Sequence, residues 1–252
     1  MYALITGASS GIGAEFARQL AKEGYHLILV ARRKDRLSRL KLQLEQTYSI
    51  RVKCLSYDLS KREECIHLYE SCKSYHITLV INNAGVGKAG YSTNLSLEEE
   101  LAILDTNITA VHILTKLFAT TLTSAKILNV ASIAAFTPIP IMAAYGASKS
   151  YVLQYSRAVN YELKKQKSST RIAVLCPGPV YTEFHQVAGV TNELRGISAK
   201  QCVREALVGL KKGKEVIVPS STTKLMRYLL KFAPTCLTLP IEENIQSKKL
   251  SK

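Results

Sequence analysis

Short apolar runs alternate with longer amphipathic segments along most of the chain. The runs are rich in isoleucine, valine and leucine, and they predict strands at residues 2–6, 26–31, 51–56, 78–82, 127–132, 171–176 and 215–218. Helical patterns lie between the runs, and this alternation is typical of βαβ units around a parallel sheet. Several runs are apolar at nearly every position, as strands are when helices cover both faces of a sheet. The pattern therefore predicts an α/β fold, a doubly wound parallel sheet of about seven strands with helices on both faces.

The length and composition of the chain fit a single domain. It has 252 residues, of which 47% are hydrophobic and 21% are charged, so it can bury a full core. No internal repeat or low-complexity linker interrupts the alternation, which continues to about residue 219. We expect residues 1–219 to form the main part of the domain and residues 220–252 to form a C-terminal helical extension and tail.

The charge of the chain favours an anionic partner. The net charge is +15; residues 31–53 carry eight basic and two acidic side chains, and residues 200–252 carry eleven and four. Such an excess is typical of proteins that bind phosphate-bearing ligands, nucleic acid or acidic membrane surfaces. The six cysteines show no metal-ligand spacing, so we expect free thiols and no metal site. The N-terminus shows no signal-peptide pattern and the longest uncharged stretch contains prolines, so we expect a soluble, cytoplasmic protein.

A glycine-rich loop follows the first predicted strand. After Thr6, residues 7–13 read GASSGIG and lead into a helical pattern. A strand, a glycine turn and a helix in this order aim backbone N–H groups at one point, which a pyrophosphate can approach closely. The alternative is a tight turn whose glycines serve only helix–strand packing.

The GxxxGxG spacing after a threonine resembles the cofactor loop of the classical short-chain dehydrogenase/reductase family. This resemblance implies a Rossmann-type fold and an enzyme that uses a nicotinamide dinucleotide. It also implies cofactor contacts from these loop residues: Gly7, Ser9, Ser10, Gly11, Ile12 and Gly13.

The residues after the second predicted strand indicate which dinucleotide is used. In dinucleotide-binding folds an acidic residue at this point binds the 2′-hydroxyl of the adenosine ribose, but this chain has Arg32 and Arg33 there. A cationic pair can hold a 2′-phosphate through charge-assisted hydrogen bonds, so we predict NADP(H) rather than NAD(H). The basic residues that follow are expected to cover a solvated helix face: Lys34, Arg36, Arg39 and Lys41.

Polar segments also follow the third and fourth predicted strands. Asp58 and Leu59 follow the third, and the segment NNAG at residues 82–85 follows the fourth. Ligands of open α/β sheets bind at these carboxyl ends, although each segment alone could be a turn. The resemblance implies that Asp58 contacts adenine, with Leu59 beside it. It further implies that the fourth-strand segment supports the sheet and the adenosine pocket through Asn83, Ala84 and Gly85.

Tyr145 and Lys149 are the candidate acid–base pair. Their i,i+4 spacing places both on one face of a predicted helix. A phenol has a pKa of about 10, and a neighbouring ammonium lowers that pKa and makes the phenol useful for proton transfer. Ser132 ends the fifth predicted strand beside this helix. Asn107 lies within a long helical pattern, where an asparagine indicates a kink, a water site or simple exposure.

The order and spacing of these four residues match the catalytic tetrad of the same family. The resemblance implies that Tyr145 is the general acid/base and that Lys149 lowers its pKa and holds the nicotinamide ribose. It also implies that Ser132 orients the carbonyl and that Asn107 anchors a proton-relay water. Taken singly, Ser132 could be a cap, Asn107 a surface residue and Lys149 a solvated charge.

The sixth predicted strand ends at the segment CPGPVYT, residues 176–182. The resemblance implies that this turn closes over the nicotinamide, with cofactor contacts from Pro177, Gly178, Val180 and Thr182. Residues 183–199 are expected to form a mobile lid, in which His185 is a surface or packing residue. Apolar residues after Ser132 are expected to line the substrate end of the pocket, which favours a lipophilic carbonyl compound; they are Ile133, Ala134, Phe136 and Ile139.

A basic amphipathic helix is predicted near the C-terminus. Lys224, Arg227 and Lys231 share one stripe, while the apolar side chains lie largely elsewhere. Such helices can lie on acidic membranes, but this one is short, so we favour packing beside the substrate pocket or a neighbouring subunit. Residues 247–252 are expected to be frayed.

Together these observations favour an NADP(H)-dependent enzyme that interconverts a ketone or aldehyde and an alcohol. The alternative is a non-catalytic NADP(H)-binding sensor or scaffold, against which the complete tetrad speaks. A nucleic-acid or membrane-surface protein is suggested only by the net charge, and the sequence shows no motif that reads bases. The resemblance implies a homodimer or homotetramer that associates through the two long helices beginning near residues 97 and 146.

Overall fold

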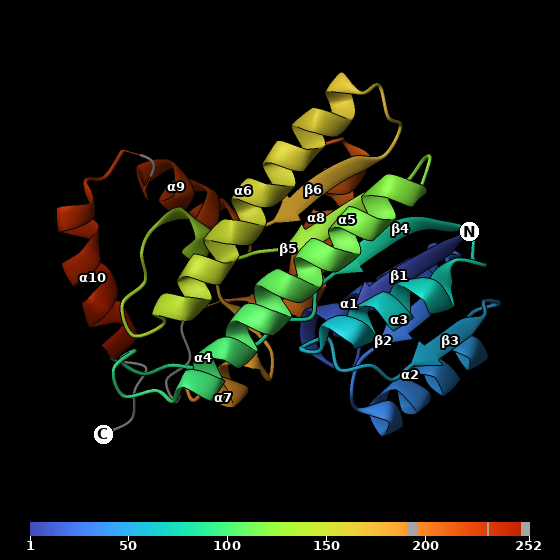
Figure 1. The fold of residues 1–252 in the computed structure, drawn as a ribbon, viewed down its shortest axis with the longest axis horizontal. Helices are drawn as coiled ribbons and strands as arrows, with labels where there is room; N and C mark the ends of the chain where they lie inside the picture. Colours follow the sequence, from blue (N-terminus) through green and yellow to red (C-terminus); the bar gives the residue numbers. More distant parts are fainter. Residues whose placement is uncertain (191–195, 231, 248–252) are drawn as a thin grey trace.

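All seven predicted strands lie in one parallel sheet (Figure 1). The computed structural model describes residues 1–190, 196–230 and 232–247. The strand order is β3-β2-β1-β4-β5-β6-β9, and every neighbouring pair is parallel. The strands are β1 (Tyr2–Thr6), β2 (His26–Val30), β3 (Val52–Leu55), β4 (Ile77–Asn82), β5 (Lys126–Val130), β6 (Arg171–Leu175) and β9 (Val216–Ile217). The predicted fold class is therefore confirmed.

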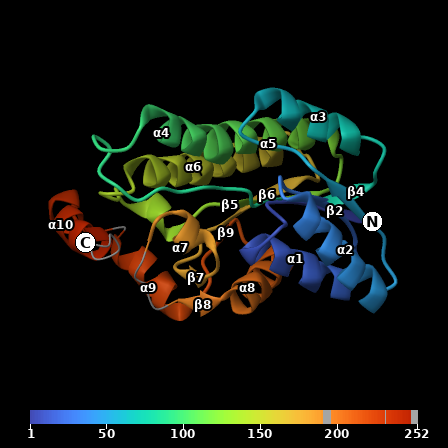
Figure 2. The same cartoon turned by 90° about the horizontal axis from the view of Figure 1, so that it is seen from below.

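Helices cover both faces of the sheet (Figure 2). One layer contains α1 (Gly11–Lys22), α2 (Lys34–Thr47) and α8 (Ala199–Lys211). The other contains α3 (Arg62–Cys72), α4 (Leu97–Leu104), the π-helical turn η1 (Asp105–Thr109), α5 (Ala110–Thr121) and α6 (Ala143–Lys165). The shorter helices are η2 (Ile133–Phe136), α7 (Phe184–Val187), α9 (Ser221–Leu230) and α10 (Thr235–Ser247).

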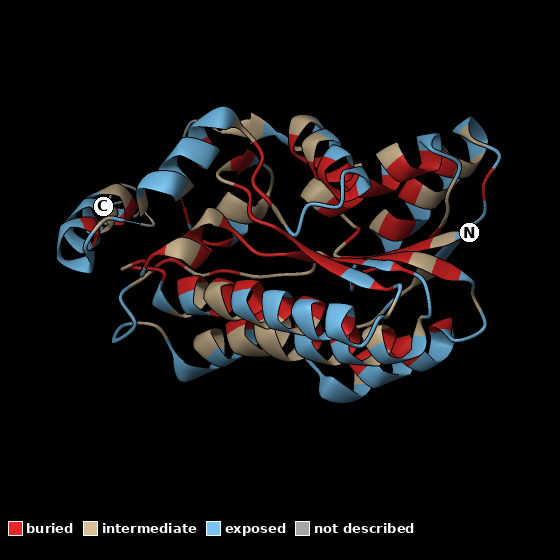
Figure 3. Cartoon of the chain, turned by 90° about the horizontal axis from the view of Figure 1, so that it is seen from above, coloured by how far each residue is buried: buried red, intermediate tan, exposed pale blue. Residues whose placement is uncertain are grey.

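Alternate residues along each strand face opposite helix layers. In β1, Ala3 and Ile5 belong to the cluster that includes Phe16 of α1, whereas Leu4 belongs to the cluster that includes Phe118 of α5. Side chains of a strand point to opposite faces in turn, so a strand covered on both faces is apolar at nearly every position. The buried strands run through the middle of the molecule, with exposed residues on the outer helix faces (Figure 3).

The strand order reverses next to β1, with β2 and β3 on one side and β4, β5 and β6 on the other. In open sheets of this kind, a crevice forms at the reversal, outside the carboxyl ends of the strands. Thr6, the last residue of β1, joins the two halves there: its Oγ1 accepts hydrogen bonds from the backbone N–H groups of Asn83 (2.9 Å) and Ala84 (3.0 Å). The predicted polar strand ends therefore meet at one place.

A buried polar cluster connects this part of the sheet to the helices behind it. Asn82 Nδ2 donates to Asn129 Oδ1 (2.9 Å) and to Thr115 Oγ1 (3.2 Å), and Asn129 Nδ2 donates to Ser156 Oγ (2.8 Å). All four residues are at most 1% exposed. The cluster thus links β4 and β5 to α5 and to α6, the helix that carries Tyr145 and Lys149.

The continuous helix from Leu97 to Thr121 is long and apolar enough to cross a membrane by length and composition. In this structure it packs against α3 and α6 as part of a helix layer. It also contains Asn107, which is fully buried within the protein. These contacts identify it as a layer helix of the α/β domain.

One feature in the last third of the chain was not predicted from the sequence. β7 (Val180–Tyr181) and β8 (Ile197–Ser198) form a small separate parallel pair. The helical extension expected beyond residue 219 consists of two helices, α9 and α10, which project from the body of the domain (Figure 1). The expectations for Lys231, for residues 191–195 of the lid and for residues 248–252 of the frayed segment lie outside the described residues. Ser247, the first residue of that segment, is the last residue of α10.

Candidate active site

One cavity of about 470 Å³ brings the predicted site residues together at the carboxyl ends of the strands. All of them line it except Gly13 and Asn107. The lining residues are Gly7, Ser9, Ser10, Gly11, Ile12, Arg32, Arg33, Asp58, Leu59, Asn83, Ala84, Gly85, Ser132, Tyr145, Lys149, Pro177, Gly178, Val180 and Thr182. Segments that lie far apart in the sequence therefore form one site, as the sequence predicts.

The glycine loop forms a tight cradle at one end of the cavity. Gly7 has a φ of +65°, and Asn83 Nδ2 donates to the backbone oxygens of Thr6 (2.9 Å) and Gly7 (3.3 Å). A Cβ atom on Gly13 would lie 2.3 Å from the Gly7 oxygen and 2.6 Å from Asn83 Nδ2. The loop can therefore fold this tightly only with glycine at position 13. The cradle leads into the N-terminus of α1, where backbone N–H groups can bind a pyrophosphate.

The substitution Gly13→Ala should destabilise the domain because its methyl group would overlap the Gly7 carbonyl and the Asn83 amide. We expect a loss of about 3 kcal/mol in the free energy of unfolding, measured by urea titration. Gly24→Ala is the control. It meets no atom within 4 Å and only strains a left-handed backbone, so it should cost about 1 kcal/mol. Equal losses in the two variants would contradict the tight cradle.

The two predicted arginines lie beside the glycine loop, and a third arginine lies next to them. Arg33 Nη2 donates to Ser9 Oγ (3.0 Å) and Ser10 Oγ (2.8 Å), and Arg32 lines the same cavity. Arg36, expected on a solvated helix face, pairs with Glu183 (2.6 Å), which also pairs with Arg33 (3.1 Å). The Arg36 side chain is thus partly solvated, with 37% of its surface exposed, and it also pairs with a residue of the cavity wall. Its i,i+3 spacing from Arg33 is the sequence signal that places both on one side of α2.

Asp58 and Leu59 lie in the turn after β3. Asp58 Oδ1 accepts hydrogen bonds from the Ser60 backbone N–H (3.2 Å) and from Ser60 Oγ (2.9 Å). Leu59 is 6% exposed, and both residues line the cavity. Asp58 and Leu59 therefore form a turn, and they also lie at the cavity wall as predicted.

The acid–base pair lies at the other end of the cavity. Lys149 is buried, its Nζ donates to the Val130 oxygen (3.1 Å), and it lies 5.7 Å from the centre of the Tyr145 ring. Ser132 forms a hydrogen bond with the Tyr145 hydroxyl group and caps η2, where its Oγ accepts from the Ala134 N–H (3.2 Å). Ser132 thus caps a helical turn and also lies against the phenol.

Burial controls the protonation of both groups. It raises the pKa of Tyr145 to about 12, and the hydrogen bond with Ser132 opposes this effect only in part. Burial also lowers the pKa of Lys149 to about 8. The pKa of Tyr145 is thus raised where a lowered value was expected, because the loss of solvation is the largest effect. At neutral pH the site therefore holds a neutral phenol and a protonated lysine.

Asn107 lies just behind the cavity wall. It sits in η1, where the Ala110 N–H bonds to the oxygen of Asp105, five residues earlier, and its full burial rules out simple exposure. Asn107 Nδ2 donates to the Val86 oxygen (2.9 Å) and to Ser148 Oγ (2.9 Å), and its Oδ1 accepts from the Val86 N–H (2.9 Å). These bonds hold α6 against the segment that follows β4.

The turn after β6 closes the cavity from the opposite side. Thr182 packs on the glycine loop, where a Cβ atom on Gly11 would meet Thr182 Cβ at 3.2 Å. Gly178 lies against α9, because its Cβ would be 2.7 Å from Thr223 Oγ1. Within the described part of the predicted lid, α7 begins at Phe184, two residues after Thr182, and its His185 lines the cavity.

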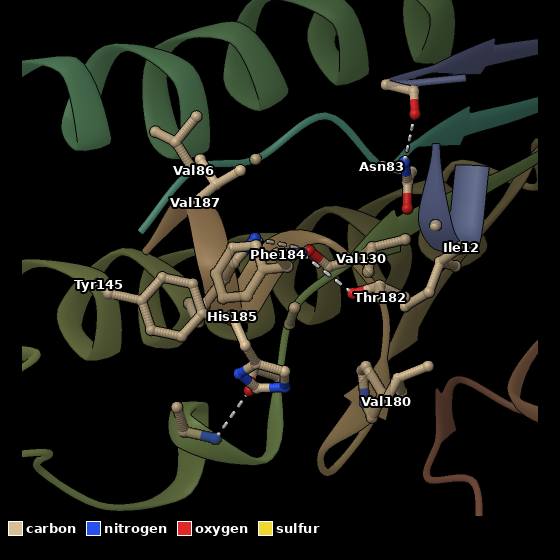
Figure 4. Close-up of a pocket in the computed structure, with 18 of the residues that line it drawn as sticks. Ile12, Asn83, Val86, Val130, Tyr145, Val180, Thr182, Phe184, His185 and Val187 are labelled. Atoms are coloured by element: carbon tan, nitrogen blue, oxygen red, sulfur yellow. Dashed lines mark hydrogen bonds between the residues drawn. The ribbon is translucent and has the colours of Figure 1, made fainter. Parts of the chain in front are cut away.

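An apolar wall surrounds the catalytic end. Phe184, which the sequence analysis missed, lies 5.4 Å from the Tyr145 ring, measured between ring centres (Figure 4). Phe136 was expected at the substrate end but does not line the cavity; its ring packs under Arg227 instead (5.1 Å). Further apolar side chains come from the segment after β5 and from the C-terminal helices: Ile133, Ala134, Ile139, Met142, Met226, Leu230 and Ile245. The preferred position of the C-terminal helix, beside the pocket, is confirmed.

Comparisons with known proteins agree with this geometry. A short chain dehydrogenase family model matches residues 1–193. The very-long-chain 3-oxoacyl-CoA reductase of Vanderwaltozyma polyspora is 33% identical over 187 residues, which cover 69% of this chain and 54% of that protein. The 17-beta-hydroxysteroid dehydrogenase type 3 of Homo sapiens is 31% identical over 211 residues, which cover 82% and 67%. The chain thus spans between about half and two thirds of the length of these relatives.

A solved structure shares both the fold and the sequence pattern. The short-chain dehydrogenase from Sphingobium yanoikuyae, in complex with NADPH, superposes with a TM-score of 0.82 and 31% identity. The superposition covers 87% of this chain and 88% of that chain. The likeness therefore extends over most of both chains.

Proposed function

Because the chain belongs to the short-chain dehydrogenase family, we propose that it is an NADP(H)-dependent reductase of a lipophilic ketone or aldehyde. One observation carries the proposal: Tyr145, Ser132 and Lys149 meet at one end of a cavity whose other end is a glycine cradle flanked by arginines. This arrangement suits proton transfer at one end and dinucleotide binding at the other.

The residues around the cradle fit a phosphorylated dinucleotide. The space that Gly7 and Gly13 leave open and the N-terminus of α1 would hold the pyrophosphate. Arg33, with the neighbouring hydroxyl groups of Ser9 and Ser10, would hold a 2′-phosphate. The bound dinucleotide would supply the hydride.

The chain's own residues would handle the proton. Tyr145 is a neutral phenol at neutral pH and would donate its proton to the carbonyl oxygen of the substrate. Ser132 would orient that oxygen by a hydrogen bond, and the Lys149 ammonium would stabilise the phenolate that remains. A protonated phenol suits reduction, because oxidation of an alcohol would need the phenolate first.

The cavity wall and the relatives support a lipophilic substrate. Apolar side chains from η2, α7 and α9 surround the catalytic end. The relatives include a very-long-chain 3-oxoacyl-CoA reductase and a 17-beta-hydroxysteroid dehydrogenase. We therefore expect NADPH consumption to be fastest with steroid or 3-oxoacyl compounds in a panel that also contains sugar and small aromatic carbonyls, with NADH run in parallel. Tight NADPH binding without turnover of any carbonyl would instead favour a sensor or scaffold.

Replacing Arg33 by glutamine should lower activity with NADPH but not activity with NADH. The variant loses a charged hydrogen-bond donor at the proposed 2′-phosphate site, so kcat/KM for NADPH should fall by about 10- to 100-fold while that for NADH changes little. Arg39→Gln is the control, because Arg39 is exposed on α2, the helix that Arg33 precedes, and pairs with Asp35 outside the cavity. A similar loss with both cofactors would contradict the role of Arg33.

Self-association and a cytoplasmic location form part of the same proposal. Exposed apolar side chains on the two long helices support association of copies: Leu97 is 66% exposed and Tyr161 is 61% exposed. The six cysteines are free thiols, which fits a reducing compartment.

A further inference from the structure

One acidic side chain lies among the arginines at the cofactor end of the cavity. Glu183 follows the turn after β6, and both of its carboxylate oxygens face cations of α2 and its N-cap. Arg36 Nη1 donates to Oε1 (2.6 Å) and to Oε2 (2.8 Å), and Arg33 Nη1 donates to Oε2 (3.1 Å). These contacts join segments that are about 150 residues apart in sequence.

The same guanidinium groups border the serine hydroxyls of the glycine loop. Arg33 donates to Ser9 and Ser10 with Nη2 and to Glu183 with Nη1, so its planar group lies between the loop and the carboxylate. Glu183, Arg32 and Arg33 all line the cavity. The other acidic side chain at this end, Asp58, is hydrogen-bonded within its own turn.

We propose that Glu183 is a cofactor-specificity residue that acts as an internal counter-ion, occupying cations that the 2′-phosphate of NADP(H) requires. This inference rests on the proposed use of NADP(H). A 2′-phosphate brought to Arg33 meets the carboxylate of Glu183 close by, and it has to displace this group or bear its repulsion. NAD(H), which has a hydroxyl there, meets no such competition. Glu183 therefore weakens the binding of NADPH but not that of NADH, and it reduces the difference in affinity between the two cofactors.

The charge of Glu183 persists over the physiological pH range. Arg36 and then Arg33 hold the pKa of its carboxyl group below the usual value, so it is ionised at neutral pH. The pairs are partly exposed, with side-chain exposures of 37% to 43%, so they are weak enough to be exchanged for a phosphate.

The test measures binding of two nucleotides that lack nicotinamide, so it does not depend on turnover. Adenosine 2′,5′-bisphosphate carries the 2′-phosphate, and ADP does not. In titration calorimetry, Glu183→Gln should tighten the binding of adenosine 2′,5′-bisphosphate by about three- to tenfold and change the Kd of ADP by less than twofold. The gain should shrink as the salt concentration rises.

Glu215→Gln is the matched control. Glu215 pairs with Lys164 outside the cavity, and its substitution changes the net charge by the same amount. It should leave both Kd values unchanged. Thermal unfolding of each variant checks that the fold is intact, and if Glu183→Gln fails to fold, Glu183→Ala takes its place.

Each result has a distinct meaning. If Glu183→Gln weakened the binding of both nucleotides equally, the carboxylate would be a group that helps to hold the cofactor. That result would overturn the proposal. Unchanged binding of both would overturn it as well. The wild-type chain and Glu183→Gln could both bind ADP and show no higher affinity for the bisphosphate. That result would overturn both the NADP(H) preference and this inference. A wild-type chain that prefers the bisphosphate, with an unaltered preference in the variant, would overturn the inference alone.

Discussion

Replacing Tyr145 by phenylalanine should lower kcat by about 10³-fold or more and leave the Kd of NADPH within about twofold. The ring remains in place, packed against Phe184 and below Lys149, so the wall of the cavity is preserved. What is lost is the only atom of this side chain that can give a proton to the carbonyl oxygen. Single-turnover consumption of NADPH measures the loss in the chemical step, and fluorescence titration measures binding.

Tyr161→Phe provides the matched control for this prediction. Tyr161 lies on the same helix, α6, and is 61% exposed, so loss of its hydroxyl group should not alter turnover. Near-normal activity of Tyr145→Phe would show that another group supplies the proton, and His185 at the cavity wall would be the first to test.

Replacing Lys149 by methionine should lower kcat/KM by about 100-fold or more and at the same time stabilise the fold. The activity falls because the phenolate of Tyr145 and the bound nucleotide lose a cation. The stability rises because a buried ammonium with a pKa of about 8 is costly to hold protonated at neutral pH. The difference between this pKa and the ordinary lysine pKa of 10.5 corresponds to a loss of about 3 kcal/mol in the free energy of unfolding. Loss of the hydrogen bond to the Val130 oxygen offsets part of this gain.

The pH dependence of stability tests the same lysine. The penalty on wild type is complete below pH 8 and disappears as the pH rises toward 10.5, the usual value for lysine, because the unfolded chain binds more protons over this range. The stability advantage of Lys149→Met, measured by urea titration, should therefore shrink between pH 8 and pH 10. Lys165→Met, on the exposed end of α6, should show neither effect. An advantage that stays constant with pH would contradict the buried ammonium.

The framework of the fold and most of the site could be predicted because they are encoded locally. Each strand is a short apolar run, and the glycine loop and the Tyr145–Lys149 pair are each contained in a few consecutive residues. Their position at one cavity follows from the rule that ligands bind at strand ends.

The missed features depend on contacts between distant segments. Glu183 reaches Arg36 across 147 residues, and Phe184 meets Tyr145 only after the turn beyond β6 has folded back. The pKa of Tyr145 moved opposite to expectation because burial is a property of the assembled cavity. β7 and β8 have two residues each, too few to show a pattern of alternation.

The buried cluster of Asn82, Thr115, Asn129 and Ser156 limits how the helices can be arranged on the sheet. An apolar interface tolerates small rotations and slides of a helix, since one methyl group can replace another as a neighbour. Polar groups without access to water accept only the arrangement in which their partners align, because each unmet hydrogen bond costs about 1–3 kcal/mol. The cluster thus fixes how α5 and α6 are oriented on the sheet. It sets the rotation of α6 about its own axis, and with it the direction in which Tyr145 and Lys149 point.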